Sequence, residues 1–126
     1  MGTFHAALWL DHHEAKIFHL TEKSYETQTL EAAHKHVKRH PTVTAEHEHP
    51  ADAKRYYHDV AVALSGSHEI LVVGPGQAKL EFIKHVHGHD APLVPRIVGV
   101  ETVDHPTDGQ IVAYARKYFR AADALR

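Results

Sequence analysis

The sequence predicts a protein of the α/β (α+β) class, built on one mixed five-stranded sheet with helices packed on it. Three observations predict this class. The first 32 residues contain three strand-like segments, helical and strand-like segments alternate after residue 50, and 126 residues suffice for one domain with one core. The element order is therefore βββαβαβα, in a single domain over 1–126.

The first three strands are predicted to form an antiparallel meander. Residues 4–11 are apolar and predict a buried strand, and residues 14–21 predict its hairpin partner. A tight turn at His12 and His13 joins the two strands. Residues 25–32 alternate in polarity with little apolar content, which is typical of an exposed edge strand and offers a surface for an oligomer.

The later elements alternate between helix and strand. Apolar residues recur at helical spacing over 51–65 and 77–87, whereas the runs 69–73 and 96–103 predict strands. The run 69–73 is apolar and rich in β-branched residues, so we expect it to be buried on both faces of the sheet. A last helix is expected to begin near residue 107.

The start of the last helix and the order of the strands follow from local pattern and chain handedness. Thr107 and Gln110 have the spacing of a capping box, which predicts a helix start. Three antiparallel strands followed by right-handed βαβ units predict the strand order 3-2-1-4-5. That order is ribonuclease-H-like, whereas doubly wound folds lack the initial meander.

Composition limits the function classes. No apolar run approaches the roughly 18 residues of a membrane span, and the first residues lack a signal-peptide pattern, so we expect a cytoplasmic protein with no membrane partner. The chain has no cysteine, which excludes thiolate metal sites and cysteine nucleophiles. A formal net charge of −2 does not indicate a DNA-binding protein. The 15 histidines make surface charge sensitive to pH.

One stretch resembles a family of translation factors. The run LVVGPGQAKLEFIKHV is similar to the strand–turn–helix of the central domain of archaeal and eukaryotic peptide-chain release factors and of Pelota. In that family a buried strand leads into Gly-Pro-Gly, followed by a short spacer, lysine and phenylalanine. Gly74, Pro75, Gly76, Lys79 and Phe82 occupy those positions in this sequence.

The first hairpin carries the second part of the resemblance. In the family an apolar strand ends in an acidic turn that is followed by Glu-Ala and a second strand, and Asp11, Glu14 and Ala15 match that pattern. The resemblance extends over nearly the whole chain and is sharp at these two places. It implies a single-domain, bacterial-type relative with the ribonuclease-H-like fold that the element order also predicts.

The segment between the third strand and the first helix departs from the family. Release factors carry a Gly-Gly-Gln tip there, which promotes ester hydrolysis at the peptidyl-transferase centre. Residues 34–50 are histidine-rich and contain no Gly-Gly-Gln, and the Asp-Gly-Gln at 108–110 begins the last helix instead. The resemblance therefore implies a translation-associated protein that binds the ribosome or its RNA, in ribosome rescue or dormancy, without catalysis or peptide release.

Basic residues in this segment are the expected contacts to RNA phosphates. They are Lys35, Lys38, Arg39 and His40. Binding through such residues should weaken steeply as salt is added. The alternative is a solvated loop whose charge is offset by the acidic residues that follow it.

The Gly74 and Gly76 turn, with Lys79 after it, is a weaker candidate for phosphate binding. A helix N-terminus beside a lysine can hold an anion. In the competing interpretation the turn is structural, since glycine permits the corner and Pro75 begins the helix.

Histidines spaced at i and i+2 are weak candidates for chelating zinc, nickel or copper. They are His34, His36, His47, His49, His85, His87 and His89. A structural zinc site needs four ordered ligands, so we expect no resident cofactor. We expect only adventitious binding of Zn or Ni. The alternative function is therefore a histidine-rich divalent-metal-binding protein.

A degenerate Mg²⁺-dependent nuclease is the third hypothesis. Ribonuclease-H-like enzymes place an aspartate on the first strand among several carboxylates, and Asp11 and Asp104 follow two of the predicted strands. The strand 69–73 offers no interior carboxylate, and the first helix carries only Asp52 and Asp59. A third ligand is therefore missing, and no catalytic residue is assigned.

Overall fold

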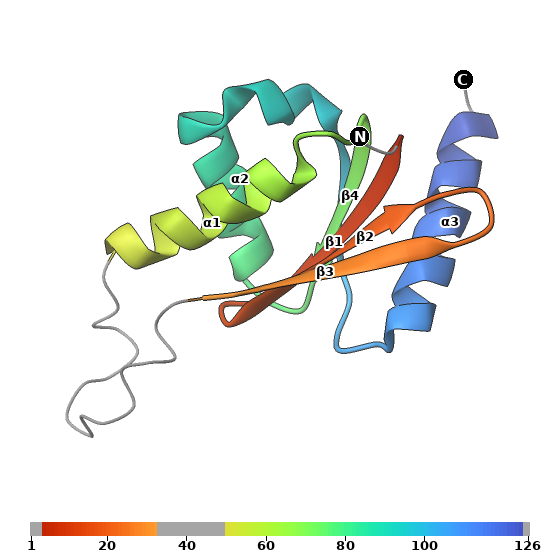
Figure 1. Cartoon of the computed structure of the whole chain (residues 1–126), viewed down its shortest axis with the longest axis horizontal. Helices are drawn as coiled ribbons and strands as arrows, with labels where there is room; N and C mark the ends of the chain where they lie inside the picture. The colour runs from red at the N-terminus through yellow and green to blue at the C-terminus, as the bar shows by residue number, and fades with distance from the viewer. Residues whose placement is uncertain (1–3, 33–49, 125–126) are drawn as a thin grey trace.

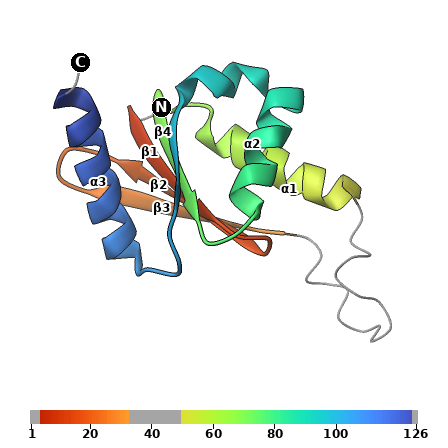
Figure 2. The same cartoon turned by 180° about the vertical axis from the view of Figure 1, so that it is seen from behind.

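The elements lie in three layers, with a central sheet between two layers of helices. The computed structural model describes residues 4–32 and 50–124. Figure 1 and the reverse view in Figure 2 show two helices, α1 and α2, on one face of the sheet and α3 on the other. Among the described residues, no helix is long and apolar enough to cross a membrane.

The element order agrees with the prediction. The strands are β1 (His5–Leu10), β2 (Glu14–Leu20), β3 (Tyr25–Glu31), β4 (Glu69–Gly74) and β5 (Ile97–Thr102). The helices are α1 (Pro50–Leu64), α2 (Ala78–His89) and α3 (Asp108–Ala124), with the short 3₁₀ helix η3 (Ala91–Arg96) before β5.

The sheet has the predicted order β3-β2-β1-β4-β5. β2 pairs antiparallel with both β1 and β3, whereas β1 pairs parallel with β4 and β4 with β5. Every residue of β4 is buried, and β3 is almost wholly exposed at the sheet edge, as the two patterns predicted. The sequence prediction of a ribonuclease-H-like mixed sheet is confirmed.

One face of the sheet packs against α1 and α2. On this face Leu8 of β1 and Val72 of β4 are fully buried. They share one apolar core with Val60 and Leu64 of α1 and Phe82 of α2. Each such side chain stabilises the fold by about 1.5–3 kcal/mol on burial, so this core holds both helices on the sheet.

The opposite face packs against α3. Side chains alternate along a strand, so Trp9 of β1 and Leu71 of β4 point to this side and form a second core with Ala115 and Phe119 of α3. The indole Nε1 of Trp9 donates a hydrogen bond of 2.9 Å to the backbone carbonyl of Asp104. The buried indole therefore keeps a polar partner while it fills the layer under α3.

The capping box that the sequence predicted begins α3. The backbone N–H of Thr107 donates to Gln110 Oε1 over 2.9 Å, and the backbone N–H of Gln110 donates to Thr107 Oγ1 over 3.2 Å. The two side chains thus satisfy two donors that the helix leaves unpaired at its start.

The turn after β4 differs from the prediction in two respects. Pro75 does not begin the helix: α2 begins at Ala78, because the carbonyl of Gln77 accepts the first helical hydrogen bonds. The glycines are not required for backbone conformation, since none among the described residues has a positive φ. Gly74 is required by space, because a Cβ there would overlap the carbonyl oxygen of Leu10.

The end of α2 also differs from the prediction. The helix continues to His89, and η3 follows where the sequence indicated no element. Pro92 and Pro95 lie within η3 and lack the N–H donors of a regular helix. Because η3 is also short, its sequence shows no helical periodicity that could have predicted it.

The close approach at Gly74 predicts an asymmetric effect of adding a methyl group. We expect Gly74→Ala to lower the free energy of unfolding by about 2 kcal/mol, because Leu10 is backbone in a buried strand and cannot move aside. Gly76→Ala is the matched control, since a Cβ there meets nothing within 4 Å. Urea denaturation of both variants measures the difference, and equal midpoints would contradict the packing argument.

The capping box predicts a second loss of stability. Thr107→Ala should lower the free energy of unfolding by about 1 kcal/mol, because the N–H of Gln110 loses its side-chain acceptor. Thr107→Ser keeps a hydroxyl and should retain most of that stability. Thermal unfolding followed by circular dichroism compares the two, and indistinguishable variants would mean that water replaces the cap without loss.

Candidate functional site

The turns that the sequence singled out meet at one edge of the sheet. β1, β4 and β5 are parallel, so their carboxyl ends share this edge, and Gly74 pairs with Thr102 there. Ligands of open α/β sheets bind outside the carboxyl ends of the strands. The hairpin turn after β1, the turn after β4 and the loop before α3 all lie at this edge (Figure 1).

Asp11 builds the hairpin turn. Its Oδ1 accepts the backbone N–H groups of His13 at 2.7 Å and Glu14 at 2.9 Å, which fixes the tight turn that the sequence predicted. The backbone carbonyl of Asp11 accepts a hydrogen bond of 2.9 Å from the hydroxyl of Tyr56 on α1. Burial, and next the nearby Asp11 carboxylate, raise the pKa of the Tyr56 phenol, which therefore stays a donor.

Glu81 on α2 joins three elements at the same edge. Its Oε1 accepts a hydrogen bond of 2.8 Å from the hydroxyl of Tyr57 on α1 and lies 3.1 Å from Nε2 of His12 in the hairpin turn. The backbone N–H of Ala32 in turn donates to the carbonyl of His13 over 2.9 Å. The hairpin turn therefore ties together the end of β3, α1 and α2.

The predicted RNA contacts belong to the segment that leaves β3 at this edge. Lys35, Lys38, Arg39 and His40 lie outside the described residues, between Ala32 and the start of α1. The same holds for four of the candidate metal ligands: His34, His36, His47 and His49. Their roles remain predictions, and the structure supplies the anchors of the segment on either side.

Lys79 lies in the first turn of α2, with its ammonium directed back at the turn after β4. Only 6% of the residue is exposed, and Nζ donates a hydrogen bond of 2.6 Å to the carbonyl of Gly76. This contact, with the close approach at Gly74, supports the structural interpretation of the motif. A phosphate would have to displace Gly76 from the ammonium, so a role in anion binding remains a prediction.

The i and i+2 histidines of α2 lie on different sides of the helix, so their role as a chelating pair remains a prediction. Residues two apart on a helix face different sides. His85 is accordingly buried, whereas His87 is exposed. His85 instead lies near His89, one turn away, with 5.1 Å between the ring centroids.

Tertiary structure brings His85 together with two residues that sequence spacing did not pair with it. His85 Nε2 lies 2.8 Å from Asp90 Oδ2, and His58 Nδ1 on α1 lies 3.1 Å from the same oxygen. Burial tends to raise the pKa of Asp90, but the hydrogen bonds and positive charges of His58 and His85 outweigh it and lower the pKa. No sequence signal could find this cluster, since His58 and Asp90 are 32 residues apart.

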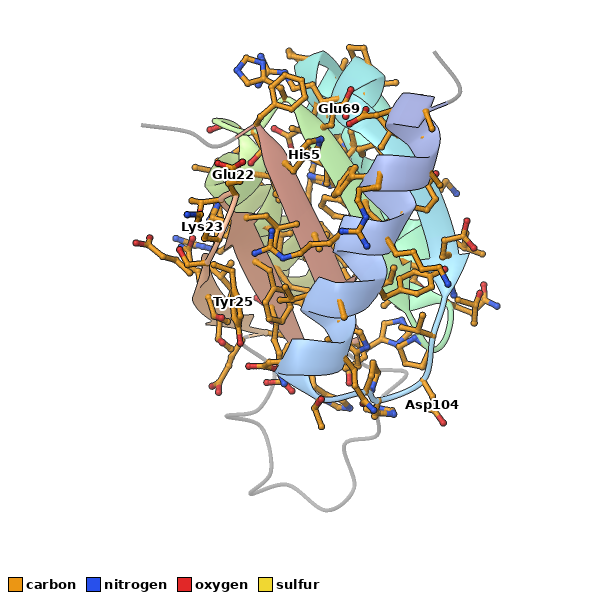
Figure 3. All side chains as sticks on the ribbon, turned by 90° about the vertical axis from the view of Figure 1, so that its right-hand side faces the viewer. His5, Glu22, Lys23, Tyr25, Glu69 and Asp104 are labelled. Carbon is orange, nitrogen blue, oxygen red and sulfur yellow. The ribbon has the colours of Figure 1, made fainter. Side chains whose placement is uncertain are left out.

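The carboxylates of the nuclease hypothesis do not form a cluster. Among residues 4–32 and 50–124, the groups of three or more side chains that could hold a metal ion include neither Asp11 nor Asp104. Asp11 is engaged in its turn, and the side chain of Asp104 is 93% exposed and points away from the body of the protein (Figure 3).

The second such group lies at the opposite end of the sheet. His5, Glu69 and Asp123 place their ligand atoms within 4.8 Å of one another, and His5 Nε2 lies 3.1 Å from Glu69 Oε1. Figure 3 shows His5 and Glu69 side by side, far from Asp104. Two carboxylates and one imidazole on three separate elements were not predicted from the sequence.

A hollow of about 480 Å³ lies at the carboxyl edge, between β4, the loop after β5 and α3. Its lining is mainly apolar and includes Val73, Val103, Ile111 and Tyr114, with His105 at the loop. The sequence analysis missed it, because the hollow forms only where α3 crosses the ends of two strands.

Solved structures share this fold. The Thermoplasma acidophilum Pelota protein matches with a TM-score of 0.63 and 18% identity, over 90% of this chain and 32% of its own. The archaeal translation termination factor aRF1 matches with a TM-score of 0.56 and 20% identity, over 96% of this chain and 38% of its own.

A yeast protein extends the comparison. Saccharomyces cerevisiae Dom34, a translation termination-like factor involved in RNA quality control pathways and interacting with Hbs1, matches with a TM-score of 0.58 and 12% identity, over 86% of this chain and 31% of its own. No family model and no curated protein matches the sequence.

These likenesses define the class of fold. The chain has the ribonuclease-H-like fold of a domain of translation termination factors and Pelota proteins. It spans about a third of the length of those proteins. The resemblance inferred from the Gly74–Gly76 turn and the first hairpin is confirmed at the level of the fold.

The placement of Lys79 predicts a structural effect of removing its charge. Lys79→Met should lower the free energy of unfolding by about 1–3 kcal/mol, because the carbonyl of Gly76 loses a charged donor. Lys84→Met, on the exposed side of the same helix, should change stability by less than about 0.5 kcal/mol. Chemical denaturation measures both, and an unchanged Lys79→Met variant would remove the structural role.

Proposed function

We propose that this domain is a translation-associated protein that binds the ribosome or its RNA, in ribosome rescue or dormancy, without catalysing peptide release. The observation that carries the proposal is the fold shared with Pelota, aRF1 and Dom34. The ribosome is the partner that the sequence resemblance implies. Likeness of fold supports a related task, and the residues of this chain must supply the contacts.

The segment between β3 and α1 is the proposed contact with RNA. Its cations are Lys35, Lys38, Arg39 and His40, which would neutralise phosphates and release counterions on binding. The residues that flank the segment contact the hairpin turn at the carboxyl edge, through the bond from the N–H of Ala32 to His13 and the bond from the hydroxyl of Tyr56 on α1 to Asp11. Binding energy gained by the segment would therefore orient the whole domain.

The absence of peptide release is part of the proposal. The sequence contains no Gly-Gly-Gln. The carboxamide of Gln110, in the Gly-Gln pair at the start of α3, accepts the N–H of Thr107 in the capping box and is thereby engaged. These observations support binding without ester hydrolysis.

The exposed edge strand is a separate surface. β3 pairs with β2 on one side, and its residues are almost wholly exposed. Pairing of two copies through this strand remains a prediction.

The proposal predicts that reversing the charge of the segment abolishes ribosome binding. Replacing Lys35, Lys38 and Arg39 with Glu should lower co-sedimentation of the untagged protein with ribosomes at least tenfold, because three attractive phosphate contacts become repulsive. The wild-type protein should also lose affinity steeply as salt is raised from about 50 to 200 mM.

A matched variant separates a local effect from net charge. Lys84, Lys117 and Arg120 are exposed on α2 and α3, and replacing them with Glu changes the net charge by the same amount. This control should still pellet with ribosomes. If both variants behave alike, the segment is not the contact, and if the wild type never pellets at low salt, the ribosome is not the partner.

A further inference from the structure

We propose that His58, His85 and Asp90 form a binding site for one divalent transition-metal ion, of which zinc is the best-matched example. The three side chains come from α1, α2 and the residue between α2 and η3. Their ligand atoms, two ring nitrogens and one carboxylate oxygen, all lie within 4.8 Å of one another. This inference is independent of the proposed ribosome contact.

Two of the separations between ligand atoms are close to those of tetrahedral coordination. Zinc bonds of about 2.0–2.1 Å place neighbouring ligand atoms about 3.3–3.4 Å apart. His85 Nε2 and Asp90 Oδ2 are 2.8 Å apart, and His58 Nδ1 and Asp90 Oδ2 are 3.1 Å apart. An ion therefore needs adjustments of only a few tenths of an ångström at these two pairs.

The backbone holds two of the ligands in place. The N–H of Asp90 donates to the carbonyl of Val86 and the carbonyl of Asp90 accepts the N–H of Leu93, both over 3.0 Å, so Asp90 closes α2 and opens η3. His85 is 5% exposed at its side chain, and its ring lies 6.0 Å from that of Tyr57. Ordered ligands of this kind reduce the entropy that metal binding would otherwise cost.

The third ligand leaves an entry path. The side chain of His58 is 53% exposed, so an ion can reach Asp90 from solvent. Two imidazoles and one carboxylate are the protein ligands of zinc sites that keep a fourth position for water. Without a metal ion, the rings of His58 and His85 both form hydrogen bonds to the carboxylate of Asp90. A bound ion would replace these two hydrogen bonds with three coordinate bonds.

The donor set favours this cluster over the second group in the fold. His5, Glu69 and Asp123 offer one imidazole and two carboxylates, a harder set that suits zinc or nickel less well. The site also fastens α1 to the end of α2, two helices that pack on the same face of the sheet. Bound metal should therefore stabilise the fold.

Isothermal titration of Zn²⁺ into untagged, chelator-treated protein tests the proposal. The parent chain carries His34, His36, His47 and His49 replaced with Asn, so that these four histidines cannot bind the ion. We expect one Zn²⁺ per chain and a Tm raised by about 5–10 °C at a hundredfold excess over Kd. Co²⁺ in place of Zn²⁺ should give the visible absorption of a tetrahedral site.

Three variants of this parent locate the ion. His58→Asn should weaken Zn²⁺ binding at least tenfold and reduce the rise in Tm. Because the side chain of His58 is exposed, this substitution should not unfold the protein. Asp90→Asn should act in the same way. His87→Asn, exposed on the same helix as His85, is the control and should bind as the parent does.

Two outcomes would overturn the site. A parent that binds no Zn²⁺ would show that His58, His85 and Asp90 do not hold the ion and form a hydrogen-bonded cluster alone. Equal affinities of His58→Asn and His87→Asn would place the ion elsewhere in the chain.

Discussion

The parallel pairing of β1 with β4 is the interaction on which the rest of the structure depends. Both strands are apolar at nearly every position, because each sends alternate side chains to two different helical layers. Leu8 and Val72 meet α1 and α2, whereas Trp9 and Leu71 meet α3. Neither layer can be removed without exposing half of this central pair to water.

The same pairing decides where the turns gather. Parallel strands end at a common edge, so the turn after β1 and the turn after β4 become neighbours, and the backbone of Leu10 comes close enough to Gly74 to exclude a side chain. The carboxylate of Asp11 and the ammonium of Lys79 then form hydrogen bonds with backbone groups of these turns. The motifs that carry the family resemblance therefore lie together at one edge of the sheet.

The two proposed activities use different parts of this framework. The RNA contact uses a segment attached to the carboxyl edge, whereas the metal site lies where α1 meets the end of α2. Tyr57 connects the two regions, since its hydroxyl bonds Glu81 at the edge and its ring lies beside His85. The likeness to Pelota and aRF1 is a likeness of fold. It does not by itself identify the residues of either proposed site.

The sequence by itself determined the five strands, the three long helices, their order and the cap of α3, because periodicity, β-branching and the Thr107–Gln110 spacing act over a few neighbouring residues. Only the tertiary structure decided the contacts made across long separations. It joined His58 to Asp90 and His85, and Tyr56 to Asp11. These outcomes depend on how α1 and α2 pack on the sheet, and packing distances are not encoded in any local pattern.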